Sequence, residues 1–283
     1  MDLQLTSAGV LKSLLRSRGI HLSKRLGQNF LCNESAVCRI VETLGPDSSA
    51  LEIGAGVGTL TVPLAQRVRR LVAVEIDDRL IPLLQDHLKA CPNVSLIHDD
   101  ILHVDLTDVA SRLECAFDVV GNLPYQITSP LLDKLVRARA TIGQAVLMVQ
   151  REVADKILSP VGSGHGSALG VFVQAFAQVQ KLFHVSRGAF FPPPQVDSTV
   201  FKLTFLPQPR FRANEVTYFK VVRAAFNLRR KTIRQALIQS PFLGLPAAQV
   251  ESLLSQTNID HKRRGETLTL EEFDQLAAAV QRL

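Results

Sequence analysis

The sequence predicts an α/β fold in which a doubly wound parallel sheet is followed by a small all-α domain. From about residue 49, short apolar runs alternate with helical patterns, and a glycine-rich turn follows the first of these runs. The last quarter of the chain carries helical patterns only. Because strands that alternate with helices build parallel sheets with right-handed crossovers, we expect the first part of the chain to form the sheet.

Each predicted element rests on its apolar pattern and on the residues that flank it. Five buried strands are predicted at residues 50–53, 71–75, 94–98, 117–120 and 145–149. The helices predicted between them cover residues 59–68, 78–90 and 130–140. Residues 170–176 form an apolar run, and the runs at 179–184 and 199–205 predict a hairpin at the end of the sheet. Later helices are predicted at residues 216–227, 231–239, 247–255 and 270–283.

Two prolines mark the boundary between the predicted domains. They stand in the stretch Leu206-Pro207-Gln208-Pro209, and closely spaced prolines stiffen a linker. We therefore place one domain at residues 1–208 and a small helical domain at residues 209–283. Residues 1–20 predict a basic amphipathic surface helix, and they lack the apolar core and cleavage site of a secretory signal. The alternative is a transit peptide, against which the acidic Asp2 argues.

Composition argues against several classes of protein. The 283 residues are 46% apolar, which is enough for a substantial core, but no apolar run approaches the ~20 residues that span a bilayer. The four cysteines form no CxxC pair, and their irregular spacing indicates thiols in a reducing compartment, so we expect a cytoplasmic protein. The seven histidines form no HExxH or comparable set, so we expect no metal site.

Charge is distributed unevenly along the chain. Residues 1–28 carry 5 basic and 1 acidic residues, residues 29–200 carry 14 and 18, and residues 201–283 carry 13 and 7. The two ends are therefore basic and the middle is acidic. A basic end is often only a solvated surface, but two basic ends around an acidic middle fit better with a polyanionic partner held around a site.

The stretch from Leu51 to Thr59, LEIGAGVGT, is a glycine-rich turn between a strand and a helix, where doubly wound sheets bind nucleotides. Glu75 ends the next strand, 21 residues after Gly54, which suits a carboxylate that accepts from two ribose hydroxyls. The alternative for Glu75 is a surface acid at a strand end. The GxGxG frame differs from the GxGxxG of dinucleotide sites, and Glu52 suits a zwitterionic amino-acid cofactor. The turn therefore favours S-adenosylmethionine over NAD.

Two further strand ends carry polar side chains. The third predicted strand ends in Asp99-Asp100-Ile101, where an aspartate can accept the adenine amino group of the cofactor or can simply cap a loop. The fourth is followed by GNLPYQITSP at residues 121–130. Its Asn offers a donor and an acceptor, its Pro stiffens the turn and its Tyr offers a flat face, as needed to hold a planar hydrogen-bonding ring. The alternative is an ordinary strand-to-helix turn with a capping Asn and a packed Tyr.

Taken in order, these motifs resemble those of the ribosomal RNA adenine N6,N6-dimethyltransferases, and most closely the bacterial small-subunit type. The motifs are KRLGQNFL at 24–31, EIGAGVGTLT at 52–61, Glu75, Asp100, NLPY at 122–125, FFPPPQVDS at 190–198, AFNLRRKTIR at 225–234 and RGETL at 264–268. The resemblance covers about residues 16–280. It implies a Rossmann-like class I S-adenosylmethionine-dependent methyltransferase sheet with a small all-α C-terminal domain.

The resemblance also implies a set of cofactor contacts. S-adenosylmethionine would be held by Asn29, Leu31, Gly54, Glu75, Asp100 and Asn122, and the glycine-rich turn adds Gly56. Ala55, Gln126 and Gly265 stand where the family usually has Pro, Asn and Ala, and none of these changes removes a cofactor contact. Leu123 favours the small-subunit type, because the related erythromycin-resistance enzymes tend to carry Ile there.

The activity that the resemblance implies is N6,N6-dimethylation of two adjacent adenosines near the 3′ end of small-subunit ribosomal RNA. The implied partner is the immature small ribosomal subunit, and we expect a monomer that binds no membrane. Four alternatives stay open: an RNA-binding assembly checkpoint in which methylation is secondary, an erythromycin-resistance-type enzyme acting on large-subunit RNA, a mitochondrial relative that doubles as a transcription factor, and a methyltransferase of small-molecule or DNA amines.

The reaction gives a role to each residue of NLPY. The N6 amine of adenine is a poor nucleophile because its lone pair is delocalised into the ring. We expect the side-chain oxygen of Asn122 and the backbone carbonyl of Leu123 to accept its two N–H groups, with Pro124 fixing the turn. Tyr125 is predicted to stack on a flipped-out base, and Phe190 to cover the other face of the base or to serve only in core packing.

Five basic residues are predicted to contact RNA. Lys24 and Arg25 lie next to the cofactor motif and are predicted to hold the substrate backbone. Arg229, Arg230 and Lys231 are predicted to contact phosphates, and the alternative for these three is a solvated helix face.

Overall fold

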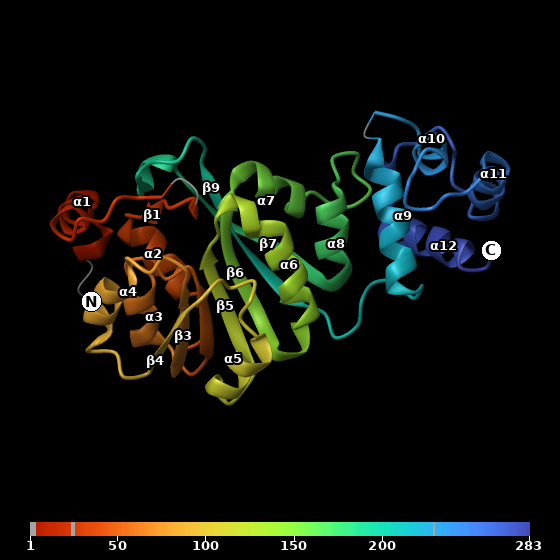
Figure 1. The fold of residues 1–283 in the computed structure, drawn as a ribbon. Helices are drawn as coiled ribbons and strands as arrows, with labels where there is room; N and C mark the ends of the chain where they lie inside the picture. Colours follow the sequence, from red (N-terminus) through yellow and green to blue (C-terminus); the bar gives the residue numbers. More distant parts are fainter. Residues whose placement is uncertain (1–3, 24–25, 229) are drawn as a thin grey trace. The chain divides into compact units, whose positions relative to one another are not determined.

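The structure is a computed structural model that describes residues 4–23, 26–228 and 230–283 (Figure 1). The predicted RNA contacts at Lys24, Arg25 and Arg229 lie outside the described residues, as does the side chain of Tyr125. The chain forms two compact units. The first consists of Met1–Ala154 and Gln180–Phe205, and the second of Asp155–Val179 and Leu206–Leu283.

A seven-stranded sheet organises the first unit, in the order β4-β3-β2-β5-β6-β9-β7 (Figure 1). Its strands are β2 (Ser49–Ile53), β3 (Arg70–Glu75), β4 (Val94–His98), β5 (Phe117–Asn122), β6 (Ile142–Gln150), β7 (Ala177–Val185) and β9 (Ser198–Phe205). The strands from β4 to β6 pair in parallel, and β9 pairs antiparallel with β6. The predicted parallel sheet is confirmed, and β7 and β9 are neighbours as the predicted hairpin requires.

Helices cover the sheet and bury its apolar residues. They are α1 (Ala8–Ser17), α2 (Glu34–Val41), α3 (Thr61–Arg67), α4 (Ile81–Leu88), α5 (Leu106–Leu113) and α6 (Thr128–Arg137). The next helix, α7 (Arg151–Leu158), begins in the first unit and ends in the second. Ile40 of α2 and Leu64 of α3 belong to one core cluster with Val120 and Val146 of the sheet. The predicted N-terminal amphipathic helix is α1, which buries Leu11 and Leu15.

A second, two-stranded sheet joins distant parts of the sequence. β1 (Phe30–Leu31) pairs antiparallel with β8 (Phe190–Phe191), so that Phe30 lies opposite Phe191 and Leu31 opposite Phe190. The backbone N–H of Cys32 donates to the carbonyl of Ala189 over 2.6 Å and extends the pairing. This sheet brings the motif at residues 24–31 next to the motif at residues 190–198.

The second unit is helical. Its helices are α8 (Ala168–Phe176), α9 (Glu215–Asn227), α10 (Ile233–Ile238), α11 (Ala247–Gln256) and α12 (Leu270–Val280). Residues 155–179 belong to this unit, which corrects the predicted boundary after residue 208. The reason is aromatic packing: the rings of Phe172 and Phe219 lie 5.1 Å apart, and those of Phe176 and Phe211 lie 5.5 Å apart. No helix of the described residues is long and apolar enough to cross a membrane.

Candidate functional site

A pocket opens where the carboxyl ends of β2, β3 and β5 meet, the usual ligand position in a doubly wound sheet. Five segments and Val149 of β6 contribute to its wall; the segments are residues 26–31, 52–60, 75–80, 122–124 and 190–198. Of the predicted site residues, this pocket brings together Asn29, Leu31, Gly54, Gly56, Glu75, Asn122, Leu123, Pro124 and Phe190. Their individual roles stay predictions.

The glycine-rich turn forms one side of the pocket with backbone that only glycine adopts easily. Gly54 and Gly56 have φ angles of 75° and 60°, in the left-handed region. A Cβ atom on Gly56 would lie 2.9 Å from Cε1 of Phe30 in β1. Any side chain at position 56 would therefore collide with the ring that closes the pocket from the other sheet.

Glu75, at the end of β3, holds this turn by hydrogen bonds. Its Oε2 accepts from the N–H of Gly56 over 2.6 Å, and its Oε1 accepts from the N–H groups of Ile76 and Asp77 over 3.0 and 2.8 Å. Burial raises the pKa of Glu75 even though these three donors favour the charged form. Since a carboxylate has about four acceptor sites, Glu75 keeps capacity for one more hydrogen bond.

Glu52 is the most buried acid in the pocket wall. It is the penultimate residue of β2 and is 1% exposed. Burial raises the pKa of Glu52 to about 8, and the nearby charge of Glu75 adds to the rise. Its Oε2 atom, like Oγ1 of Thr59, has no hydrogen-bond partner among the described residues. Unpaired buried polar atoms beside a pocket indicate a place where a ligand supplies the missing partner.

The NLPY stretch follows β5 and fixes the orientation of one amide. The side-chain Nδ2 of Asn122 donates to the carbonyl of Asn29 over 2.9 Å, and no donor in the part of the chain that the structure describes reaches its Oδ1. Leu123 donates its N–H to the carbonyl of Met148 over 2.9 Å, and no donor of the described residues reaches its own carbonyl. The stretch thus offers two acceptors to the pocket. Tyr125 begins a short 3-10 turn, Tyr125–Ile127.

Phe190 is shared between the pocket and the core. It is 4% exposed, lines the pocket and also belongs to the core cluster that includes Leu31 and Met148. Both of the predicted readings therefore agree with its position. Its neighbour Phe191 packs with Phe30 in the cluster around α1.

Asp100 lies in an adjoining pocket rather than in the first one. This second pocket is lined by Asp99, Asp100 and several apolar side chains, and it shares Leu26, Gly54, Ile76 and Pro124 with the first. The Oδ1 atom of Asp100 accepts from the N–H of Leu102 over 2.9 Å, so the loop-capping alternative is realised for this oxygen. Ile76 and Ile101 also line this pocket, and their apolar side chains suit a flat ring.

A third pocket shares Gly27, Gln28, Asn29 and Pro194 with the first. Apart from the apolar Leu22, its described lining residues are amides, prolines and small residues: Ser23, Gly27, Gln28, Asn29, Gln126, Gln150, Pro192, Pro193, Pro194 and Gln195. None of them carries a charge. Neutral amides and flat proline faces suit a neutral ring better than a phosphate.

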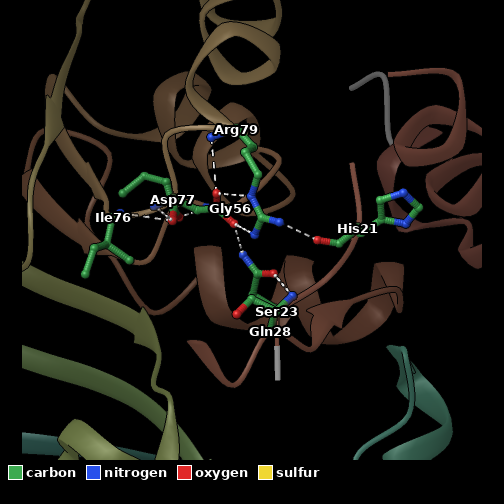
Figure 2. A network of polar contacts seen from close by, with 8 residues as sticks. His21, Ser23, Gln28, Gly56, Ile76, Asp77 and Arg79 are labelled. Atoms are coloured by element: carbon green, nitrogen blue, oxygen red, sulfur yellow. Dashed lines mark hydrogen bonds and ion pairs between the residues drawn. The ribbon is translucent and has the colours of Figure 1, made fainter. Parts of the chain in front are cut away.

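Sequence reasoning missed three polar residues that hold the wall of these pockets. Gln28, Asp77 and Arg79 form a hydrogen-bonded network next to Glu75, which Figure 2 shows together with His21 and Ser23. The one sequence signal for Gln28 is its place between Gly27 and Asn29 in the first motif. Among the described residues, no group of three or more His, Cys, Asp or Glu side chains could hold a metal ion.

The predicted phosphate contacts that the structure describes lie in the second unit. Arg230 and Lys231 are exposed in the turn between α9 and α10, where the N–H of Lys231 donates to the carbonyl of Leu228 over 2.9 Å. Arg234, Arg263 and Arg264 are instead paired with Glu251, Glu272 and Glu266.

Comparison with known proteins places the chain in a family. The family model described as ribosomal RNA adenine dimethylase matches residues 20–276. A ribosomal RNA small subunit methyltransferase A from Geobacillus sp. (strain WCH70) is 38% identical over 288 residues, covering 99% of each chain. The protein of the same name from Shouchella clausii is 41% identical over 274 residues, covering 95% of this chain and 93% of the relative.

Solved structures agree with this placement. A dimethyladenosine transferase from Plasmodium falciparum is 25% identical, with a TM-score of 0.76, and the match covers 89% of this chain and 98% of that one. The 23S rRNA methyltransferase ErmE is 29% identical, with a TM-score of 0.67 and coverage of 89% and 100%. The chain therefore belongs to the ribosomal RNA adenine dimethylase family and has the class I methyltransferase fold of these enzymes.

Proposed function

We propose that this protein transfers methyl groups from S-adenosylmethionine to N6 of two adjacent adenosines near the 3′ end of small-subunit ribosomal RNA. Family membership supports the proposal, as do relatives named for the small subunit along nearly their whole length. The observation that carries it is the orientation of Asn122. Since its Nδ2 is bonded to Asn29, its oxygen is left to accept an N–H of the target amine.

The pockets fit S-adenosylmethionine. The unpaired oxygens of Glu52 and Thr59 suit the ammonium of an amino-acid group, and Glu75 has an acceptor site left for a ribose hydroxyl. The pocket lined by Ile76, Ile101 and Asp100 suits the adenine ring and its amino group. When bound, the cofactor supplies an electrophilic methyl group on a sulfonium sulfur.

The chain's own residues then make the target amine reactive. Oδ1 of Asn122 and the carbonyl of Leu123 accept its two N–H groups and so favour a tetrahedral nitrogen whose lone pair is free for attack. Pro124 has no N–H and keeps the turn open to the base. Tyr125 and Phe190 hold the flipped-out base by stacking. The amide-lined third pocket, which shares Asn29 and Pro194 with the first, extends the space that receives the base.

The rest of the RNA is held by charge. Arg230 and Lys231 contact phosphates, and Lys24, Arg25 and Arg229 are proposed to do the same. The partner is the immature small ribosomal subunit in the cytoplasm, and the enzyme acts as a monomer.

The role of Asn122 can be tested by its replacement. We expect Asn122→Ala to lower the rate of methyl transfer by roughly 10²–10³, because one preorganised acceptor is lost. Asn122→Asp keeps an acceptor and should retain a measurable part of the rate, although its carboxylate faces the carbonyl of Asn29. Single-turnover transfer with saturating cofactor isolates this step from cofactor binding. A near wild-type rate for Asn122→Ala would show that Asn122 is only a turn residue.

A further inference from the structure

The segment between α1 and β1, residues 20–28, contributes to two pockets at once. Leu26, Gly27 and Gln28 lie in the wall of the first pocket, and Leu22 and Ser23 in that of the third. The described residues of this segment form no α-helix and no strand. Its position therefore depends on contacts with other parts of the fold.

Asp77, two residues after β3, provides these contacts (Figure 2). Its carboxylate is buried, and its Oδ2 accepts from Nε2 of Gln28 over 2.6 Å. Its Oδ1 accepts from Nε of Arg79 over 2.7 Å. Arg79 in turn donates from Nη1 to the carbonyl of His21 over 2.6 Å, and the N–H of Ser23 donates to Oε1 of Gln28 over 2.8 Å. Both ends of the segment are thus tied to one carboxylate.

The same carboxylate is connected to the cofactor pocket. The N–H of Asp77 donates to Oε1 of Glu75 over 2.8 Å, and Oε2 of Glu75 accepts from the glycine-rich turn. Burial alone would raise the pKa of Asp77, but the hydrogen bonds from Arg79 and Gln28 lower it below its ordinary value. Asp77 therefore stays charged near neutral pH, and a continuous chain of hydrogen bonds joins Gly56 to residues 20–28.

We propose that Asp77, with Gln28 and Arg79, positions residues 20–23 and 26–28 in the walls of both pockets and couples cofactor binding to assembly of the pocket for the target base. The inference rests on the proposed function, in which the ligands are S-adenosylmethionine and an adenine of RNA. A cofactor bound at Glu75 stabilises the turn that carries Asp77, and the segment held by Asp77 completes the wall that receives the base. Coupling of this kind is reciprocal between the two ligands.

Two substitutions disrupt the contacts of Asp77 with Gln28 and with Arg79 separately. Gln28→Glu keeps the size of the side chain but places a carboxylate against Asp77, where like charges repel. Arg79→Met keeps an apolar stem and removes the guanidinium, which is 40% exposed. The matched control is Arg18→Ala, which breaks a 2.9 Å ion pair between Arg18 and Asp86 of α4 and touches none of these pockets.

The experiment has two readouts with the full-length protein and the inert product S-adenosylhomocysteine. One is hydrogen exchange at the amide of Ser23 with and without the product, which needs no RNA. The other is the affinity for small-subunit RNA at zero and saturating product. In the wild type and in Arg18→Ala, we expect the bound product to slow exchange at Ser23 and to raise the affinity for RNA by about 5- to 50-fold. In Gln28→Glu and Arg79→Met, both effects should fall below about twofold while the product still binds.

A pH series separates positioning from a packing defect. The carboxyl introduced by Gln28→Glu should titrate above its ordinary range because Asp77 is close, and its protonated form can donate to Asp77 as the amide does. Coupling should therefore return in this variant as the pH falls, and should not return in Arg79→Met. A defect in packing would show no such return.

Any one of three results overturns the proposal. The first is full coupling in both Gln28→Glu and Arg79→Met, and the second is a loss of coupling in Arg18→Ala as large as in those two variants. The third is exchange at Ser23 that the bound product leaves unchanged in the wild type. A wild-type protein that binds the product but methylates no RNA would reject the proposed function instead, and the exchange readout would still decide the role of Asp77. A wild-type protein that does not bind the product would reject both.

Discussion

At the scale of single residues, the site depends on acids that the fold keeps out of water. Glu52 and Glu75 stand on neighbouring strands, and burial raises the pKa of both. A buried carboxylate with an unpaired oxygen is unfavourable for stability, so its presence marks a place selected for a ligand rather than for packing. Each acid therefore gives a prediction in which stability and binding can be told apart.

We expect Glu52→Gln to remove a loss of stability that the wild type shows as the pH rises. The pKa of Glu52 is about 8 in the folded protein, against an ordinary value of 4.5. Between these values the folded state binds more protons than the unfolded state, so the free energy of unfolding falls with rising pH. The loss amounts to about 3 kcal/mol by neutral pH and levels off above the folded pKa. Glutamine has no proton to release.

The measurement is chemical unfolding of both proteins, without cofactor, at several pH values between about 5 and 8. The two curves of stability against pH should diverge, with the variant gaining relative to the wild type at the alkaline end. Parallel curves would show that Glu52 does not stay protonated in the folded protein.

Glu75→Ala should weaken the binding of S-adenosylmethionine by ~1.5–3 kcal/mol, because the one charge-assisted hydrogen bond that Glu75 can accept from a ribose hydroxyl is lost. It should also lower the melting temperature, since three backbone N–H groups lose their acceptor. Calorimetric titration below the melting temperature of the variant measures the first effect. Asp108→Ala, which removes an exposed acid of α5, is the control. An unchanged dissociation constant for Glu75→Ala would remove Glu75 from the site.

At the scale of elements, the strands were predictable and several helices were not. All seven strands of the large sheet lie within three residues of their predicted ranges, because short buried runs between turn residues have few other interpretations. The run at residues 170–176 proves to be part of α8. This helix is buried almost all round, so its sequence shows no helical period. The sequence signal for this helix is its capping residue, Ser167, whose Oγ accepts from the N–H of Gly170.

Two other helices carried signals that the prediction did not use. α5 follows Asp105, which caps it by accepting from the N–H of Thr107, and buries Leu106, Val109 and Leu113 at helical spacing. α2 follows Asn33, which caps it in the same way through Ala36. Capping residues before a helical period would have found both.

The candidate site was predictable where a motif supplied it and not where distant residues meet. Strand ends and the glycine spacing gave Glu75, Gly54 and Asn122 their positions in one pocket. The bond from Gln28 to Asp77 joins residues 49 apart in sequence, and that from Arg79 to His21 joins residues 58 apart. No local pattern encodes such pairs, so only the folded chain reveals them.

At the scale of the whole molecule, charge determines how a polyanion is held. The most C-terminal stretch, residues 201–283, is basic, and several of its arginines are already paired with acids. Arg230 and Lys231 are exposed and pair with no acid of the described residues. Exposed basic side chains without an acidic partner can exchange counterions for phosphates, and Arg230 and Lys231 are among those of this unit.

Replacement of both Arg230 and Lys231 by Gln should flatten the slope of log affinity for RNA against log salt concentration by roughly 1–2, because each phosphate contact contributes about 0.7–0.9. S-adenosylmethionine binding should not change. Arg234→Gln is the matched control, since Arg234 is bound to Glu251 and should leave the slope unaltered. The cluster is an ordinary solvated surface if the double variant keeps the wild-type slope.

The central claim is that this chain dimethylates adenine in small-subunit RNA, and methyl transfer tests it most directly. Wild-type protein is given labelled S-adenosylmethionine with immature small subunits, naked small-subunit RNA or large-subunit RNA, and the modified bases are identified by mass spectrometry. We expect N6,N6-dimethyladenosine at two adjacent positions near the 3′ end of small-subunit RNA and no label in large-subunit RNA. Label in large-subunit RNA alone, on a base other than adenine, or in no RNA would contradict the claim.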